Sequence, residues 1–175
     1  MDVRDLSLTI IFASLYSVMV IVLAPISYGP VQLRVADCLI PLAALFGWPV
    51  VVGVTVGCFL SNAYIWLGAY DVFLGPIANF IAAVVILLLR KHRLLACVVG
   101  ALPIGAIVGG YLWLFFPPPD IFGLNLPAWT AMIVSITISS WIAIAVIGYS
   151  LLILLSRPRI IEPLESRGLK VTTES

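Results

Sequence analysis

Long apolar runs follow one another along almost the whole chain, and they restrict it to one kind of fold. A helix needs about 20 mostly apolar residues to cross a bilayer, and residues 6–24 provide that length without a charge. Five further largely apolar segments cover residues 35–48, 50–67, 71–89, 94–116 and 128–155. Only 10% of the residues are charged, against about 25% in soluble domains. The sequence therefore predicts an all-α integral membrane protein with six transmembrane helices.

The second of these segments is the weakest candidate for a full span. Residues 35–48 are fewer than a straight crossing needs, and Pro41 removes a helical hydrogen bond near their middle. We expect a helix that is kinked or lies partly outside the hydrocarbon. Residues 1–155 are predicted to form one six-helix transmembrane domain. Residues 156–175 are charged and poor in apolar residues, which is typical of a flexible cytosolic tail.

The distribution of lysine and arginine predicts the orientation, because cytoplasmic loops carry an excess of both. With the N-terminus inside, six spans place eight of the nine basic residues on the cytosolic side. These eight are Arg4, Arg90, Lys91, Arg93, Arg157, Arg159, Arg167 and Lys170. We therefore expect a multi-pass protein of the cell membrane with both termini cytosolic, and with Arg34 as the one basic residue on the outer side.

The segment between the first two apolar runs, residues 26–38, carries side chains that hydrocarbon rejects. Gln32, Arg34 and Asp37 fall within about two helical turns, and a charge at the bilayer centre costs about 2.5 to 3.5 kcal/mol. The segment must therefore lie at a surface or line a cavity. Two interpretations remain open. Either the three side chains capture one small polar ligand, or Arg34 and Asp37 simply pair with each other as a helix begins.

Other candidates lie on the same predicted outer side. Asp71 and Asn79 are eight residues apart, so their side chains face nearly the same way on one helix. Trp129 comes at the outer end of the last span. Amphipathic rings favour that interface, although the same ring could stack on a planar ligand.

Small residues at helical spacing mark two packing faces. Ala13 and Ser17 lie four apart in the first run, a spacing at which two helix backbones can approach closely in lipid. This pair indicates either a docking face for another subunit or a chance coincidence. Gly53 and Gly57 begin a similar seam in the third apolar run.

The chain lacks the residue patterns of an enzyme. It contains no Ser-His-Asp set, no metal-ligand cluster, no phosphate-binding glycine loop and no paired carboxylates. It also has no large soluble segment that could form a nucleic-acid domain. We therefore predict no enzymatic activity, no cofactor, no metal site and no nucleic-acid partner.

Three segments within the first ninety residues resemble one family of membrane proteins. Residues 28–37 (YGPVQLRVAD) resemble the motif of the queuosine-precursor transporter (QueT) family, in which glycine-proline is followed by Gln-x-Arg and a carboxylate. The resemblance continues through residues 53–62 (GVTVGCFLSN) and 70–79 (YDVFLGPIAN). The fifth and sixth spans are similar to the family only in hydropathy.

The resemblance implies a substrate-capture subunit, or S component, of an energy-coupling-factor (ECF) transporter. Such subunits have six helices, bind a micronutrient at the outer face, and dock to a transmembrane coupling subunit and two cytosolic ATPases. In similar subunits the docking face lies on the first three helices and uses small residues spaced by four on the first. Here these are Ala13 and Ser17. ATP hydrolysis is then expected in the partner subunits.

The resemblance also implies the cargo, a queuosine precursor built on 7-deazaguanine in its aminomethyl or cyano form. A carboxylate can accept hydrogen bonds from the guanine-like edge, amides can bridge other groups, and aromatic rings can cover the faces. The substrate-binding residues expected from this chemistry are Gln32, Arg34, Asp37, Asp71, Asn79 and Trp129. Two alternatives stay open: an ECF S component for another vitamin-like micronutrient, and a small membrane scaffold with no cargo.

Overall fold

Five helices of the computed structural model are long and apolar enough to cross a membrane. They are α1 (Val3–Val22), α4 (Trp48–Ile65), α5 (Ala69–Leu88), the segment Arg90–Leu112 and the segment Ala128–Leu155. The structure describes residues 2–28, 32–121, 125–166, 168 and 171, and none of these residues forms a strand. The prediction of an all-α membrane protein is confirmed, whereas the sixth apolar element is shorter than a typical span.

The remaining elements are short or continue the long helices. After α1 come α2 (Ala24–Ser27), the 3₁₀ helix η1 (Val35–Leu42) and α3 (Ala43–Phe46). The 3₁₀ turn η2 (Arg90–His92) leads into α6 (Arg93–Leu112). The last long helix changes its winding along its length, from α7 (Ala128–Ser140) through the π-helix η3 (Trp141–Gly148) to α8 (Tyr149–Leu155), and α9 (Pro158–Ser166) follows it.

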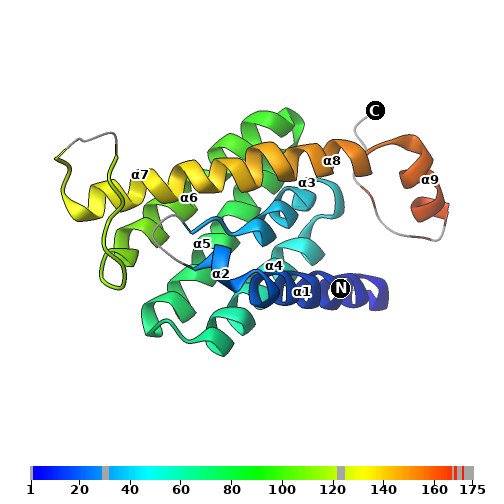
Figure 1. Ribbon diagram of the computed structural model, residues 1–175. Coiled ribbons are helices and arrows are strands. Elements are labelled where there is room, and N and C mark those ends of the chain that lie inside the picture. Colours follow the sequence, from blue (N-terminus) through cyan, green and yellow to red (C-terminus); the bar gives the residue numbers. More distant parts are fainter. Residues whose placement is uncertain (1, 29–31, 122–124, 167, 169–170, 172–175) are drawn as a thin grey trace.

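The element Val35–Phe46 takes the place of the expected second span. A 3₁₀ helix rises about 2.0 Å and an α-helix about 1.5 Å per residue, so this element is about 22 Å long, against ~30 Å of hydrocarbon. Nearly all of its side chains are buried, and Figure 1 shows it running through the interior, between α1 and the long helix of α7 and α8. Neighbouring helices thus shield its irregular backbone and polar groups from lipid.

Small residues set the contacts between the long helices. A Cβ added to Gly57 of α4 would lie 2.7 Å from the carbonyl oxygen of Ala13 in α1, and one added to Gly105 of α6 would overlap Thr137 of α7. Backbones that approach this closely gain dispersion energy, which matters in lipid because no hydrophobic force acts between helices. The glycine seam recognised in the sequence therefore faces α1.

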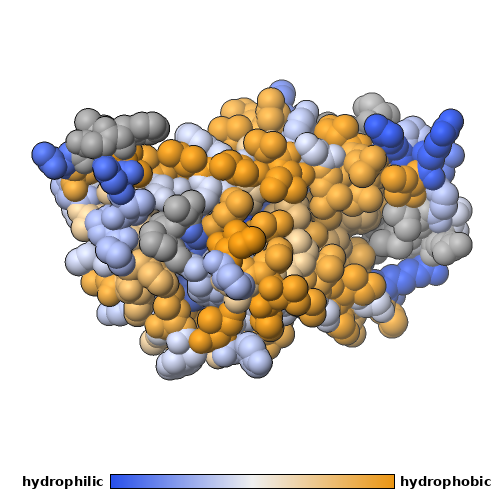
Figure 2. Space-filling view, viewed as in Figure 1, coloured by the Kyte–Doolittle hydropathy of each residue, from blue (hydrophilic) through white to orange (hydrophobic). Residues whose placement is uncertain are grey.

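The start of α1 and the helix α9 lie at the same end of the bundle, at the right in Figure 1, and the connection from α6 to α7 lies at the other end. Asp5, Trp48 and Lys91 border one open cavity of about 600 Å³ at the first of these ends. Figure 2 shows a broad hydrophobic band between hydrophilic groups that gather at the two ends. This is the pattern of a surface that contacts lipid in the middle and water at both sides.

A short helix follows the last span, within the segment for which the sequence predicts a flexible cytosolic tail. Residues Pro158–Ser166 form α9, and Ile161 is buried against the hydrophobic core. Arg4 donates a hydrogen bond from Nη1 to the carbonyl oxygen of Gly168 at 3.0 Å. Pro158 opens the helix at a position where its missing N–H costs nothing.

Candidate functional site

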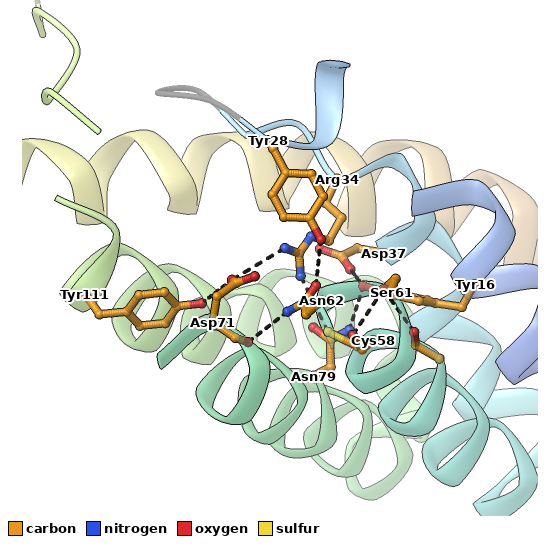
Figure 3. A network of polar contacts seen from close by, with 11 residues as sticks. Tyr16, Tyr28, Arg34, Asp37, Cys58, Ser61, Asn62, Asp71, Asn79 and Tyr111 are labelled. Atoms are coloured by element: carbon orange, nitrogen blue, oxygen red, sulfur yellow. Dashed lines mark hydrogen bonds and ion pairs between the residues drawn. The ribbon is translucent and has the colours of Figure 1, made fainter. Parts of the chain in front are cut away.

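A group of polar side chains is buried between α1, η1, α4, α5 and α6. Figure 3 shows the side chains that it labels in this group pointing toward one another. They come from these elements and from the segment before η1. We call them the polar cluster: Tyr16, Tyr28, Gln32, Arg34, Asp37, Asn62, Asp71, Asn79 and Tyr111. Tyr28 is partly exposed and the others are buried. Such groups are expensive at membrane depth, and they are typical of sites that bind or move a ligand.

One side of the polar cluster holds Asp37 through a chain of hydrogen bonds. Tyr16 donates to Oδ1 of Asp37 at 2.5 Å, and Asn79 donates from Nδ2 to the hydroxyl of Tyr16 at 2.7 Å. The three residues come from η1, α1 and α5, so the chain ties the short buried helix to two spans. Asp37 is thereby fixed in position by neutral donors.

The other side of the polar cluster holds Asp71 and the start of α5. Tyr111 donates to Oδ1 of Asp71 at 2.7 Å, and Asn62 donates from Nδ2 to the backbone carbonyl of Asp71 at 2.8 Å. A Cβ at Gly75 would lie 2.6 Å from that Nδ2, so only glycine lets Asn62 reach the carbonyl. Tyr28 completes the arrangement by donating to Oδ1 of Asn62 at 2.8 Å. Burial raises the pKa of Tyr28 to about 12, so its hydroxyl remains a donor at neutral pH.

The side chain of Arg34 lies between the two carboxylates (Figure 3). Its Nη2 is 3.8 Å from Oδ1 of Asp71, and its Nη1 donates to Sγ of Cys58 at 3.5 Å. Its Cζ lies 5.3 Å from the centre of the Tyr28 ring. A guanidinium has five N–H donors, and these long contacts satisfy them poorly. Arg34 is therefore held in the polar cluster with donor capacity to spare.

Four buried atoms of the polar cluster have no hydrogen-bond partner among the described residues. They are Nε2 of Gln32, Nε and Nη2 of Arg34, and Oδ2 of Asp71. A buried group left unpaired costs about 1–3 kcal/mol, and native proteins contain few of them. The polar cluster thus holds unpaired donors on two residues and one unpaired carboxylate oxygen. A ligand edge that carries an acceptor beside a donor would satisfy both kinds of atom.

The cavity beside the polar cluster is small. It has a volume of about 10 Å³ and is lined by Gln32, Arg34 and Asp37, which leaves room for about one water molecule. Its other walls are Ile104, Val108, Ile136 and Ser140. A bicyclic ligand therefore fits only after the side chains, or the segment that carries Gln32 and Arg34, move apart.

The structure brings together five of the side chains that the sequence predicts to bind a ligand. Figure 3 shows Arg34, Asp37, Asp71 and Asn79 near one another, and Gln32 lines a cavity with Arg34 and Asp37. The simple alternative, a surface pair of Arg34 with Asp37, does not describe their setting. Both are buried, and the ion pair that Arg34 makes is with Asp71. Their role in binding remains a prediction, now with a defined geometry.

Three other predicted residues lie apart from the polar cluster. Trp129 is 53% exposed on the first turn of α7. Ala13 and Ser17, predicted to dock another subunit, face α4: Ala13 is buried, and Ser17 donates from Oγ to the carbonyl oxygen of Gly57 at 2.9 Å. Their observed contact is with α4, and their role in docking stays a prediction.

Sequence reasoning missed the tyrosines of the polar cluster and Asn62. Tyr16 and Tyr111 lie within apolar runs, where tyrosine often serves only as an interfacial anchor. The signal available for Tyr16 is its depth, since it comes well inside the run that forms α1 (Val3–Val22) and not at its end. A hydroxyl at such a position needs an internal partner.

Two comparisons with known proteins relate this chain to one family of membrane transporters. A model of the QueT transporter family matches residues 6–157. The queuosine precursor transporter QueT of Lactococcus lactis subsp. cremoris is 33% identical over 81 residues, which cover 44% of this chain and 46% of that protein. The aligned part thus spans less than half of the curated relative. No solved structure matches the chain significantly.

Proposed function

This chain belongs to the QueT transporter family, and we propose that it captures a queuosine precursor at the outer face of the cell membrane for uptake. The proposed cargo is a 7-deazaguanine in its aminomethyl or cyano form. The observation that carries the proposal is the set of unpaired buried atoms on Gln32, Arg34 and Asp71. The name of the Lactococcus relative supports the choice of cargo.

The hydrogen-bonding groups of a deazaguanine complement these atoms. Its amidine-like N–H groups can donate to the free Oδ2 of Asp71, while its ring carbonyl can accept from Arg34 or Gln32. The Tyr28 ring, already 5.3 Å from the Arg34 guanidinium, is positioned to cover one face of a planar base. Asp37 provides a second carboxylate, which suits the cation of the aminomethyl form.

The proposed topology has six crossings and both termini in the cytosol. Every described Lys or Arg other than Arg34 belongs to the end of the bundle that holds the start of α1 and α9. The positive-inside rule assigns that end to the cytosol. The polar cluster then lies toward the outer face, where a nutrient arrives. Val35–Phe46 makes the short crossing.

The proposed partners are a transmembrane coupling subunit and two ATPase subunits of an ECF module. The chain contains no phosphate-binding glycine loop, so an active transporter must hydrolyse ATP elsewhere. We place the coupling subunit against α1, whose outward side chains Ile10, Val18 and Val22 are more than half exposed. Ala13 and Ser17 then affect docking by holding α1 on α4. We expect the wild type to recover the coupling subunit in a pull-down and the Ala13→Leu variant to lose it.

The decisive experiment is calorimetry on the purified, detergent-solubilised chain. The wild type is expected to bind the aminomethyl or the cyano deazaguanine, with guanine as the control for base selectivity. Absence of binding for both compounds would reject this cargo. Mass spectrometry of the purified protein separates the alternatives, because release of another vitamin would identify an S component with different cargo. Uptake into vesicles that contain no ATPase would instead identify a stand-alone facilitator.

A further inference from the structure

A second cavity, of about 330 Å³, lies next to the polar cluster on its α7 side. It is lined by Leu33, by residues 119–121, and by Ser135, Ile138, Ser139 and Ile142 of the long helix. Small-molecule sites have volumes of about 300–1,000 Å³. This cavity therefore has the size of a ligand site, which the space of about 10 Å³ beside the polar cluster does not.

The two cavities are separated by a single thickness of chain. Leu33 lines the larger cavity, while its neighbours Gln32 and Arg34 line the smaller one. Side chains alternate in the same way on the long helix, where Ser139 faces the larger cavity and Ser140 the smaller. Residues 32–34 are therefore the partition between a space of ligand size and the unpaired buried atoms.

We propose that the 330 Å³ cavity is an antechamber, a first site that holds a flat heterocyclic ligand before the ligand passes residues 32–34 into the polar cluster. The proposal rests on the proposed function, since it assumes that the polar cluster is the final binding site. It adds a second binding site and an order of events to that function.

The chemistry of the antechamber suits a flat ring with a donor edge. Leu33, Ile138 and Ile142 offer apolar surface to the faces of a ring. Ser139 lines the cavity and donates its hydrogen to the backbone carbonyl of Ile136 at 3.0 Å, so its oxygen is left as an acceptor. The carboxylate of Asp120 adds negative charge at the same cavity. These acceptors favour a ligand that presents N–H groups, as the guanine-like edge and the aminomethyl cation do.

The partition carries a feature that favours its movement. Gln32 has a φ of 44°, in the left-handed region that costs a residue other than glycine about 1–3 kcal/mol. Its Nε2 also has no hydrogen-bond partner among the described residues. Rotation of this residue can relieve the backbone strain, and a ligand can satisfy the amide. The free-energy cost of shifting residues 32–34 to admit a ligand is therefore small.

Kinetics distinguishes an antechamber from the final site. A change confined to the antechamber leaves the free state and the final bound state unaltered, so it must change association and dissociation rates by the same factor. Ser139→Leu fills the cavity and is expected to lower both rates about tenfold or more with Kd unchanged. Leu33→Ala thins the partition and is expected to raise both rates. Val146→Leu is the matched control, because Val146 is 60% exposed on the same long helix and does not line the cavity.

The rates are measured with radiolabelled aminomethyl- or cyano-deazaguanine by rapid filtration and by chase with unlabelled ligand. If Ser139→Leu and Leu33→Ala both keep wild-type rates, there is no antechamber. If Ser139→Leu weakens Kd by faster dissociation alone, Ser139 belongs to the final site and the antechamber is likewise rejected. A wild-type chain that binds neither compound rejects the proposed function itself, which separates that failure from the failure of the antechamber.

Discussion

Tyr111 donates its hydroxyl hydrogen to Oδ1 of Asp71 at 2.7 Å, while Oδ2 of the same carboxylate has no hydrogen-bond partner among the described residues. The Nη2 atom of Arg34 lies 3.8 Å from the oxygen that Tyr111 already occupies. Asp71 is thus anchored through one oxygen and offers the other. An anchored carboxylate with a free oxygen is preorganised for a ligand, because little ordering remains to be done when the ligand binds.

Replacing Asp71 by Asn is expected to weaken binding of both the aminomethyl and the cyano deazaguanine. A buried hydrogen bond to a charged group contributes about 1.5–3 kcal/mol, so affinity should fall roughly ten- to more than a hundredfold. Calorimetry on the purified variant measures this change. Wild-type affinity for both ligands in Asp71→Asn would remove Asp71 from the site.

Replacing Tyr111 by Phe tests whether the anchor matters. The variant removes one hydrogen bond to the carboxylate and keeps the ring, which packs edge-on against Phe115. Affinity is expected to fall about two- to tenfold, because a net hydrogen bond contributes about 0.5–1.5 kcal/mol. Tyr64→Phe is the control, since Tyr64 is 75% exposed. If Tyr111→Phe and Tyr64→Phe lowered ligand affinity equally, the loss would not be due to the hydrogen bond between Tyr111 and Asp71.

Asp37 separates the two forms of the ligand. Its Oδ1 already accepts from Tyr16, and the residue lines the small cavity opposite Ile104 and Val108. If its charge faces the aminomethyl cation, Asp37→Asn should weaken binding of that form and hardly alter binding of the cyano form. The comparison needs only the two ligands on one variant, again by calorimetry. Equal losses for both forms would assign Asp37 to the guanine-like edge.

The locations of the charged residues could be predicted because burying a charge in lipid is so costly. Arg34 and Asp37 had to lie in a protected place, and Asp71 and Asn79 had to share a face because eight residues separate them. The contribution of Tyr16 could not be predicted in this way. Its direction depends on how α1 is rotated against α4, and that rotation follows from contacts far apart in sequence.

The sequence also could not predict that Val35–Leu42 forms a 3₁₀ helix. An apolar run has the same composition whether it forms an α-helix or a 3₁₀ helix, and the expected kink at Pro41 gave no reason to choose. The close fit of Gly148 against Pro41 and the carbonyl of Cys38 is a tertiary contact. Such packing selects the winding, so local sequence alone cannot.

The contact of α1 with α4 leads to a prediction about stability. A Cβ at Gly57 would lie 2.7 Å from the carbonyl oxygen of Ala13 and 2.8 Å from Cβ of Tyr16. Gly57→Ala should therefore force the helices apart and lower stability by about 1–3 kcal/mol. It should also displace the hydroxyl of Tyr16 from Asp37. Thermal unfolding in detergent measures the first effect and ligand affinity the second.

Gly110→Ala is the matched control for that variant. A Cβ at Gly110 of α6 meets nothing within 4 Å, and alanine is favoured over glycine in a helix by about 0.5–1 kcal/mol. This variant should unfold at the wild-type temperature or slightly above it. If Gly57→Ala behaves like Gly110→Ala, α1 does not lie on α4 in the way described.

The orientation of the chain gives the last prediction. Cysteines that replace Val3, Lys91 and Asp120, one at a time, report which side each position faces. The native cysteines are free and buried, so an introduced thiol at these exposed positions should be the one that reacts. With six crossings and cytosolic termini, an impermeant thiol reagent should label Asp120→Cys on intact cells, and should label Val3→Cys and Lys91→Cys only after permeabilisation. Labelling of both Val3→Cys and Asp120→Cys on intact cells would mean that Val35–Phe46 does not cross the membrane. A fully reversed pattern would put the polar cluster at the cytosolic face, where it could not capture a nutrient from outside.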